Sequence, residues 1–216
     1  MPDRRRDVVT VLLEREGRTF ADEAGITLAN RPAPLYQLLV LATLLSARIS
    51  ANVAVTASRE LFAAGWRTPE AMRNSSWHDR IAALARGHYR RSGARTATML
   101  EDGAQLVARK WRGDLRGLRQ QADGDVGRLR ASLTEFPGIG PVGADIFVRE
   151  VQGQWDEFGP FVDGKVSAGA KALNLPASAS KLGALVPPAE MPRLASALVR
   201  VSLDGDVAKE IQAAAA

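Results

Sequence analysis

The sequence predicts an all-α protein from three observations. Helix-forming residues dominate the chain, capping residues open its apolar segments, and no segment alternates apolar and polar residues as a half-buried strand does. The 216 residues, 46% of them hydrophobic and 25% charged, fit one large domain or two small interleaved ones around a substantial core. The apolar runs are too short for a membrane span and lack the pattern of a signal peptide, so we expect a cytoplasmic protein.

The helices are expected in order along the chain. Arg4–Arg15 predicts a first amphipathic helix that ends at Gly17, and Arg31–Pro34 predicts a turn. Leu35–Ala47 is almost wholly apolar and predicts a helix at the centre of the fold. Thr68 is followed by Pro69, the pattern of an N-cap with proline at the first helical position. Further helices are expected over Asn52–Ala64, Ser76–Leu84, Thr96–Trp111 and Asp125–Leu133.

Composition excludes several kinds of chemistry. The chain has no cysteine, which rules out disulfides, thiolate zinc sites, cysteine-ligated iron–sulfur clusters and a cysteine nucleophile. The two histidines, His78 and His88, are too few for a multi-histidine metal centre, and we expect no metal site. Carboxylates are therefore the main candidates for acid–base chemistry.

The charge balance is basic and uneven. The net charge is +5, and 24 of the 29 basic residues are arginine, which pairs bidentately with phosphate. Between Arg80 and Arg130, twelve basic and five acidic residues give a local balance of +7. This segment could face a nucleic-acid backbone, or it could decorate the solvent faces of several helices that point in different directions.

The most informative stretch is Leu133–Ala144, with the sequence Leu-Thr-Glu-Phe-Pro-Gly-Ile-Gly-Pro-Val-Gly-Ala. One helix ends near Leu133, Gly138 and Gly140 flank an apolar residue that can enter the core, and a new helix runs from Pro141 to Val151. Free amide groups at such a helix start suit a phosphate that is bound without sequence readout. The alternative is a plain helix–helix corner that uses glycine for its turn. Pro-Gly-Ile-Gly-Pro, followed by glycine and alanine on the new helix, is more specific than such a corner requires.

A carboxylate follows this hairpin in the sequence. Asp163 lies 23 residues beyond Gly140, after a loop rich in glycine and proline and before a helical pattern that includes Val166 and Leu173. Asp163 could carry chemistry, or it could cap the helix that starts at Gly164, and the two roles are compatible.

Taken together, these motifs resemble the helix–hairpin–helix DNA glycosylase superfamily, in particular its endonuclease III branch. Beyond the hairpin and the Val-Asp loop, the resemblance includes three short segments and covers roughly residues 30–203. It implies a two-lobed helical fold with the active-site cleft between the lobes. Residues 35–150 would form the lobe that ends in the hairpin, and residues 1–34 plus 151–216 would form the other. The three segments are Leu44–Arg48, Gly87–Tyr89 and Pro188–Glu190.

The chain also departs from the family pattern. Bifunctional members carry a lysine two residues after the second hairpin glycine, where this chain has Val142. The four-cysteine cluster loop is absent because the chain has no cysteine. The adenine-excising branch has a glutamate at the position of Ala42 and a further C-terminal domain. The resemblance therefore implies an enzyme without an iron–sulfur cluster, although a monovalent cation at the hairpin carbonyls fits the family.

The resemblance assigns the chemistry to Asp163, whose carboxylate would stabilise the positive charge that develops on deoxyribose and orient a water molecule. The substrate would be a damaged or mispaired base, extruded from double-stranded DNA. The site residues expected at the DNA are Gly138, Ile139, Gly140, Val142, Arg48, His88, Arg90, Arg91, Arg95 and Lys165.

Three functions are compatible with these residues. The first is a monofunctional DNA glycosylase of base-excision repair, which acts as a monomer on DNA that contains a lesion or an abasic site. The second is a non-catalytic DNA-binding protein that retains the hairpin. The third is a glycosylase with lyase activity that uses a relocated lysine, Lys165 or Lys171.

Overall fold

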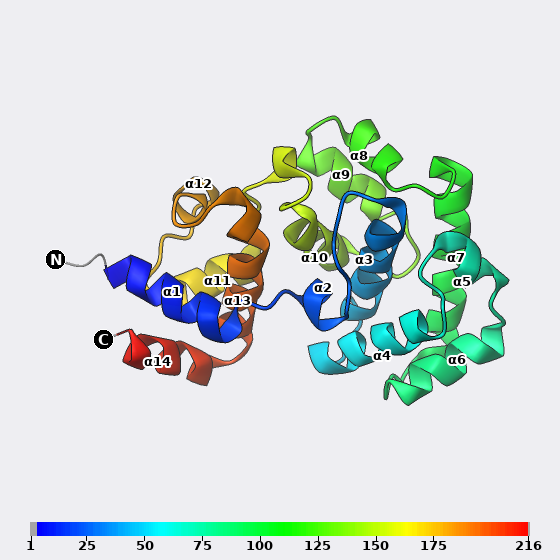
Figure 1. Ribbon diagram of the computed structural model, residues 1–216, viewed down its shortest axis with the longest axis horizontal. Helices are drawn as coiled ribbons and strands as arrows, with labels where there is room; N and C mark the ends of the chain where they lie inside the picture. Colours follow the sequence, from blue (N-terminus) through cyan, green and yellow to red (C-terminus); the bar gives the residue numbers. More distant parts are fainter. Residues whose placement is uncertain (1–3, 216) are drawn as a thin grey trace. The chain divides into compact units, whose positions relative to one another are not determined.

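The computed structural model describes residues 4–215, which form α-helices and short 3-10 helices without a strand (Figure 1). The predicted all-α class is confirmed. The chain divides into two compact units: a central unit, Ala21–Phe147, and a terminal unit that joins the described residues up to Phe20 to those from Val148 onward. The resemblance instead implies lobe boundaries after residues 34 and 150. Residues 1–3 and 216, which the resemblance assigns to the second lobe, lie outside the described part of the chain. The expected cleft between the lobes stays a prediction.

None of the helices within residues 4–215 combines the length and the apolar character that crossing a bilayer requires.

The central unit is built around α3 (Pro32–Leu45), which packs against α4 and α7. Ten consecutive residues of α3, from Leu35 to Leu44, are buried, as its apolar sequence predicts. The predicted turn at Arg31–Pro34 is wrong, because Pro32 and Pro34 lie in the first turn of this helix. Proline has no N–H group, and this costs nothing in the first turn of a helix, where main-chain N–H groups have no intrahelical carbonyl to donate to. The other helices that lie in or begin in this unit are α4 (Ala51–Ala63), α5 (Pro69–Asn74), α6 (Trp77–Arg86), α7 (Gly93–Trp111), α8 (Arg116–Ala122), α9 (Val126–Leu133) and α10 (Pro141–Val151), and the short α2 (Phe20–Glu23) begins at its boundary.

Side-chain caps fix where several of these helices begin. The Thr68 hydroxyl accepts from the Ala71 N–H at the start of α5, and the Ser76 hydroxyl accepts from the Asp79 N–H at the start of α6. Both helix starts are confirmed where the sequence predicts them. Asp125 caps α9 in the same way: its carboxylate accepts a hydrogen bond from the Arg128 N–H. This hydrogen bond stabilises the charged carboxylate and so lowers the pKa of Asp125.

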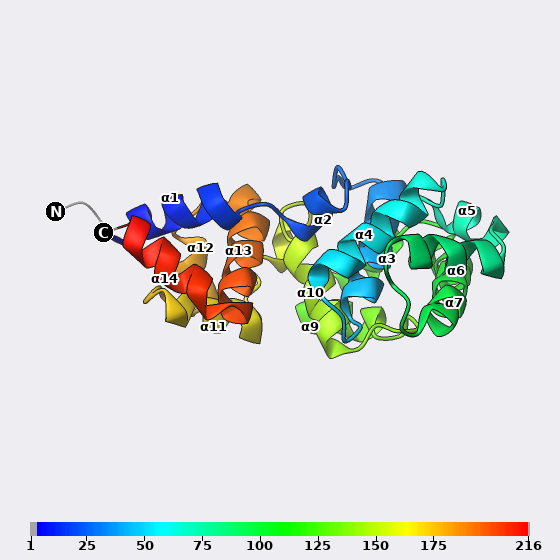
Figure 2. The same ribbon diagram turned by 90° about the horizontal axis from the view of Figure 1, so that it is seen from below.

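The terminal unit assembles segments from both ends of the sequence. Helix α1 (Arg4–Glu16) lies beside α13 and α14 in Figure 1 and Figure 2. Arg193 fastens it, since its guanidinium donates to the main-chain carbonyls of Gly17 (3.0 Å) and Leu13 (3.3 Å). The remaining elements are the end of α10, η1 (Asp156–Phe158), α11 (Gly164–Ala172), α12 (Ala179–Gly183), η2 (Pro188–Glu190), α13 (Met191–Leu203) and α14 (Gly205–Ala214).

Two close contacts hold this unit together. Helices α11 and α13 touch through their backbones at Gly169, where a Cβ atom would stand 1.9 Å from the Leu198 carbonyl oxygen. The buried Glu150 accepts hydrogen bonds at Oε1 from the Phe20 N–H (3.3 Å) and the Ser196 hydroxyl (2.9 Å). Helix α10 is thereby tied both to the chain that leaves α1 and to α13.

Candidate functional site

The hairpin joins α9 to α10 by a tight turn. Gly138 has φ +87°, in the left-handed region that glycine enters without strain, and the Ile139 N–H donates to the Phe136 carbonyl (3.0 Å). Between the two exposed glycines, the Ile139 side chain is buried at 4% exposure. An ion pair of 2.6 Å between Arg130 on α9 and Asp145 on α10 links the two helices. The hairpin is therefore anchored from inside, while its glycine backbone faces solvent.

Helix α10 begins at this turn with exposed backbone. Pro141 occupies its first position, and the Val142 side chain is 65% exposed. The first intrahelical bond runs from the Ala144 N–H to the Gly140 carbonyl, so the N–H of Val142 lies in the first turn, where an α-helix provides no acceptor. The positive end of the helix dipole lies at the same place, and the arrangement suits an anion. The expected cation at the hairpin carbonyls stays a prediction.

The end of α3 packs directly on the hairpin. A Cβ atom at Gly143 would stand 2.1 Å from the Ser46 Oγ, and one at Gly138 would stand 2.4 Å from the Met99 Cε. Ser46 Oγ itself donates to the Ala42 carbonyl (2.6 Å) as the helix ends. Arg48 follows two residues later and is exposed. The segment that carries Arg48 is therefore placed beside the hairpin within the central unit.

The loop between α6 and α7 presents polar groups from a strained backbone. His88 and Ser92 have φ values of +63° and +69°, which residues with a side chain rarely adopt. Between them Tyr89 is only 2% exposed. Its ring therefore packs in the core and is not available for a nucleic-acid base to stack on. The side chains predicted to contact DNA, those of His88, Arg90, Arg91 and Arg95, are all exposed on this loop or in the first turns of α7.

Asp163 caps α11 in the terminal unit. Its Oδ1 accepts the N–H groups of Lys165 (2.8 Å) and Val166 (2.9 Å). Its Oδ2 accepts two further bonds from the Arg149 guanidinium, at 3.0 Å from Nε and 2.7 Å from Nη2. Both side chains are only 5% exposed. The capping role weighed from the sequence is thus present, and it is accompanied by a buried ion pair.

Sequence reasoning missed Arg149. It lies in the last turn of α10, 14 residues before its partner, and no short motif links the two positions. The available signal is an arginine that directly follows the apolar run Ile146–Val148 on a helix. A charged residue inside a buried segment calls for a buried partner, and a carboxylate on a neighbouring loop is the usual one.

Gln152 fixes the loop that carries Asp163. Its Oε1 accepts the Phe161 N–H (2.8 Å), and its Nε2 donates to the carbonyls of Arg149 (2.9 Å) and Phe161 (3.4 Å). Lys165, which follows Asp163, has an exposed side chain in the first turn of α11. Lys171 is eight residues beyond Asp163 on the same helix, about 12 Å along its axis.

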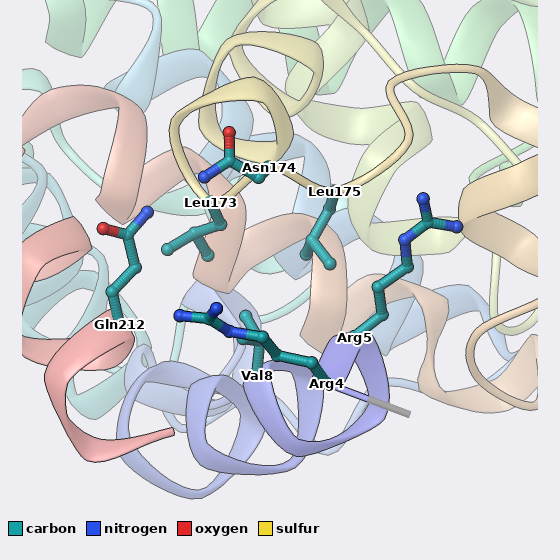
Figure 3. A pocket seen from close by; sticks show the side chains of 7 residues that line it. All are labelled: Arg4, Arg5, Val8, Leu173, Asn174, Leu175 and Gln212. Atoms are coloured by element: carbon teal, nitrogen blue, oxygen red, sulfur yellow. The ribbon is translucent and has the colours of Figure 1, made fainter. Parts of the chain in front are cut away.

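A separate cavity of about 320 Å³ lies in the terminal unit and includes none of the predicted site residues (Figure 3). Val8, Leu173 and Leu175 supply its apolar lining, and the guanidinium groups of Arg4 and Arg5 lie at its edge.

Among the described residues, no three histidine, aspartate or glutamate side chains gather as metal ligands would.

Two solved structures of other proteins are similar to this chain. A non-covalent endonuclease III–DNA complex matches with a TM-score of 0.55 and 15% sequence identity over 93% of this chain and 86% of that one. A trapped endonuclease III–DNA covalent intermediate, in an estranged-adenine complex, matches with a TM-score of 0.51 and 16% identity over the same shares. No protein-family model matches the chain, and no curated protein sequence does. The chain therefore has the endonuclease III-like fold.

Proposed function

We propose that this protein is a DNA glycosylase of base-excision repair that hydrolyses the N-glycosidic bond of a damaged or mispaired base in double-stranded DNA. The observation that carries the proposal is the Asp163 carboxylate, held rigidly at the start of α11 in a chain whose fold is that of endonuclease III. The two similar structures are DNA complexes, which supports DNA as the partner. We expect the protein to act as a monomer and without a bound cofactor.

The central unit supplies the DNA contacts in this proposal. Main-chain amides at Gly140 and Val142 bind a phosphate at the start of α10, and Ile139 holds the turn in place from inside. Arg48 and His88 fill the space that an extruded nucleotide leaves in the duplex. The other cations of the predicted site bind backbone phosphates. They are Arg90, Arg91, Arg95 and, in the terminal unit, Lys165.

The reaction needs one carboxylate and one water molecule. As the bond between the sugar C1′ and the base nitrogen breaks, its electron pair leaves with the base and positive charge develops on the sugar. Asp163 stabilises that charge, water adds to C1′, and the water's proton is released. The products are the free base and an abasic site. Val142 stands where an amine nucleophile would be needed for strand cleavage, so we expect no lyase step.

A panel of duplexes tests the proposal. Each duplex carries one lesion, namely an alkylated purine, an oxidised pyrimidine, uracil or a mispaired thymine, and release of the free base is measured by chromatography. We expect release from at least one duplex and none from the Asp163→Asn protein, which keeps a capping oxygen at position 163. Borohydride should trap no covalent adduct with abasic DNA. A trapped adduct that Lys165→Ala abolishes would instead show a lyase.

The ion pair between Arg149 and Asp163 favours a second candidate, a DNA-binding protein without turnover. A carboxylate whose two oxygens already accept four hydrogen bonds has no position left for a substrate in this arrangement. Salt-sensitive binding to duplex DNA, without base release from any member of the panel, would identify this function. Absence of DNA binding at low salt would contradict both candidates.

A further inference from the structure

The Arg149–Asp163 pair fills the acceptor positions that chemistry at this site would need. Two main-chain amides of α11 occupy Oδ1, and the Nε and Nη2 groups of Arg149 converge on Oδ2. A guanidinium 2.7 Å from the carboxylate also cancels most of the negative field that would stabilise a sugar cation. Hydrolysis at Asp163 therefore requires the guanidinium to leave Oδ2.

The surroundings allow that movement while keeping the carboxylate in place. Asp163 remains held at Oδ1 by the α11 amides, and Gln152 independently fastens the loop before it. Arg149, by contrast, holds Asp163 through the guanidinium alone, and its Nη1 makes no hydrogen bond within residues 4–215. The pair can thus open by rotation of one long side chain, with no change in the backbone.

A phosphate is the partner most able to draw the guanidinium away. Arginine binds phosphate through paired hydrogen bonds as strong as those it makes to a carboxylate, and DNA brings several phosphates close to a bound base. The Nη1 group can donate the first hydrogen bond to a phosphate oxygen before Nε and Nη2 leave Asp163. The exchange replaces one ion pair by another, so it costs far less than exposing an unpaired buried charge.

We propose that Arg149 is a latch: in the free protein it neutralises Asp163, and on DNA it transfers to a backbone phosphate and leaves the carboxylate to act on the sugar. This inference rests on the proposed function, whose chemistry at Asp163 it regulates. Arg149 is then a positioning residue that restrains the reaction in the free protein and strengthens binding in the complex. The two effects have opposite signs, which a purely structural ion pair does not produce.

The test separates these two effects with the Arg149→Met variant, which removes the charge and retains the length of the side chain. The single-turnover rate of base release, measured with protein in saturating excess, should stay within about twofold of the native rate, because in the saturated native complex Arg149 has already left Asp163, whereas loss of a purely structural ion pair would lower the rate. The protein concentration for half-saturation should also rise, and the salt slope of binding should fall by about one phosphate contact. Asp163→Asn in the same background should abolish release.

Arg193→Met is the matched control. It removes an arginine of the same unit that also forms an ion pair, with Glu190 at 2.6 Å, and contacts main-chain carbonyls rather than Asp163. In the folded fraction, established by circular dichroism, neither the rate at saturation nor the salt slope should change. A fall in the Arg149→Met rate at saturation, or an unchanged salt slope in that variant, would overturn the latch.

A readout that needs no turnover keeps the latch distinct from the glycosylase itself. The Arg149 Nε–H resonance is assigned in a 15N spectrum by its loss in Arg149→Met and is followed as a duplex with an abasic-site analogue is added. The latch predicts that this resonance moves while the amides of Lys165 and Val166 keep their positions. If no duplex in the panel releases a base but the resonance moves, the proposed function fails and the exchange stands. A resonance that stays fixed on saturation with DNA refutes the latch.

Discussion

Gly87 lies so close to the backbone of Ala57 that a Cβ atom at position 87 would stand 2.3 Å from the Ala57 Cα. This contact places the start of the loop that presents His88 against α4. Replacing Gly87 by alanine should therefore push the loop outward and destabilise the protein by about 1–3 kcal/mol, measured by urea denaturation. Gly93→Ala is the control, since nothing lies within 4 Å of a Cβ there. Equal stability of the two variants would show that the contact at Ala57 is not limiting.

Tyr36 carries a buried hydroxyl that has no hydrogen-bond partner among the described residues. Burial raises the pKa of its phenol far above the ordinary value of 10.0, against a smaller lowering by Arg80. In the unfolded chain the phenol loses its proton above pH 10, while in the folded chain it keeps it. The stability of the native protein should therefore decrease as the pH rises through that range.

The Tyr36→Phe variant removes this pH dependence. Near pH 8 it should be as stable as the native protein or more stable by about 1 kcal/mol, because an unpaired hydroxyl is no longer buried. At pH 11 its advantage should grow by about a further 1.4 kcal/mol. Denaturant midpoints at the two pH values measure the difference. An advantage that stays constant with pH would show that the phenol is accessible to solvent.

Arg80 is a fully buried cation in the central unit. It forms an ion pair with Glu101 and donates to the carbonyls of Met72 (3.1 Å) and Ser75 (2.8 Å) at the end of α5. Arg80→Met should cost about 3–5 kcal/mol, because these buried acceptors lose their donor. The exposed pair between Arg86 and Glu60 provides the control, and Arg86→Met should cost less than about 1 kcal/mol in the same thermal unfolding experiment.

Arg91 lies exposed in the loop after α6, and we expect it to contact a DNA phosphate. Arg91→Gln should lower the slope of log K against log salt by about one and weaken binding equally for all duplex sequences. Fluorescence anisotropy between about 50 and 200 mM salt, the range over which phosphate contacts change the affinity strongly, measures both quantities. Lys209→Gln, which removes a positive charge that is 80% exposed on α14, should leave the slope unchanged.

Local signals in the sequence were sufficient for most helices. Thr68, Ser76 and Asp125 each cap a helix that begins at the following residue, since a cap depends only on a side chain and amides two or three residues away. The same local reasoning failed at Pro32 and Pro34, which suit a turn as well as the first turn of a helix. Burial of the residues that follow decides between the two, and burial depends on the whole fold.

Short helices escaped the sequence reasoning for a different reason. Helix α8, seven residues long, and α12, five residues long, are each shorter than two turns, so neither shows a clear apolar repeat. Packing stabilises them, as in the contact of α8 with α9. A pattern read along the chain does not contain that information.

The candidate site shows the same difference between features that local sequence predicts and features that depend on the whole fold. The turn at Gly138 and the cap at Asp163 follow from residue types at fixed short spacing, and the structure contains both. The pairing of Asp163 with Arg149 depends on how the loop after α10 returns to that helix, which Gln152 fixes through the backbone of Phe161. Such a contact belongs to tertiary structure and has no signature in either segment alone.

The packing of α1 against α13 has a consequence for synthesis on the ribosome. Arg193 contacts carbonyls of residues made 180 and 176 positions earlier, so α1 emerges long before the helix that covers its apolar residues Val8, Val9 and Leu12. At ordinary translation speeds this wait is on the order of 10–40 s. Throughout that interval the nascent chain exposes the apolar residues of α1, which a chaperone can shield while residues 21–147 fold.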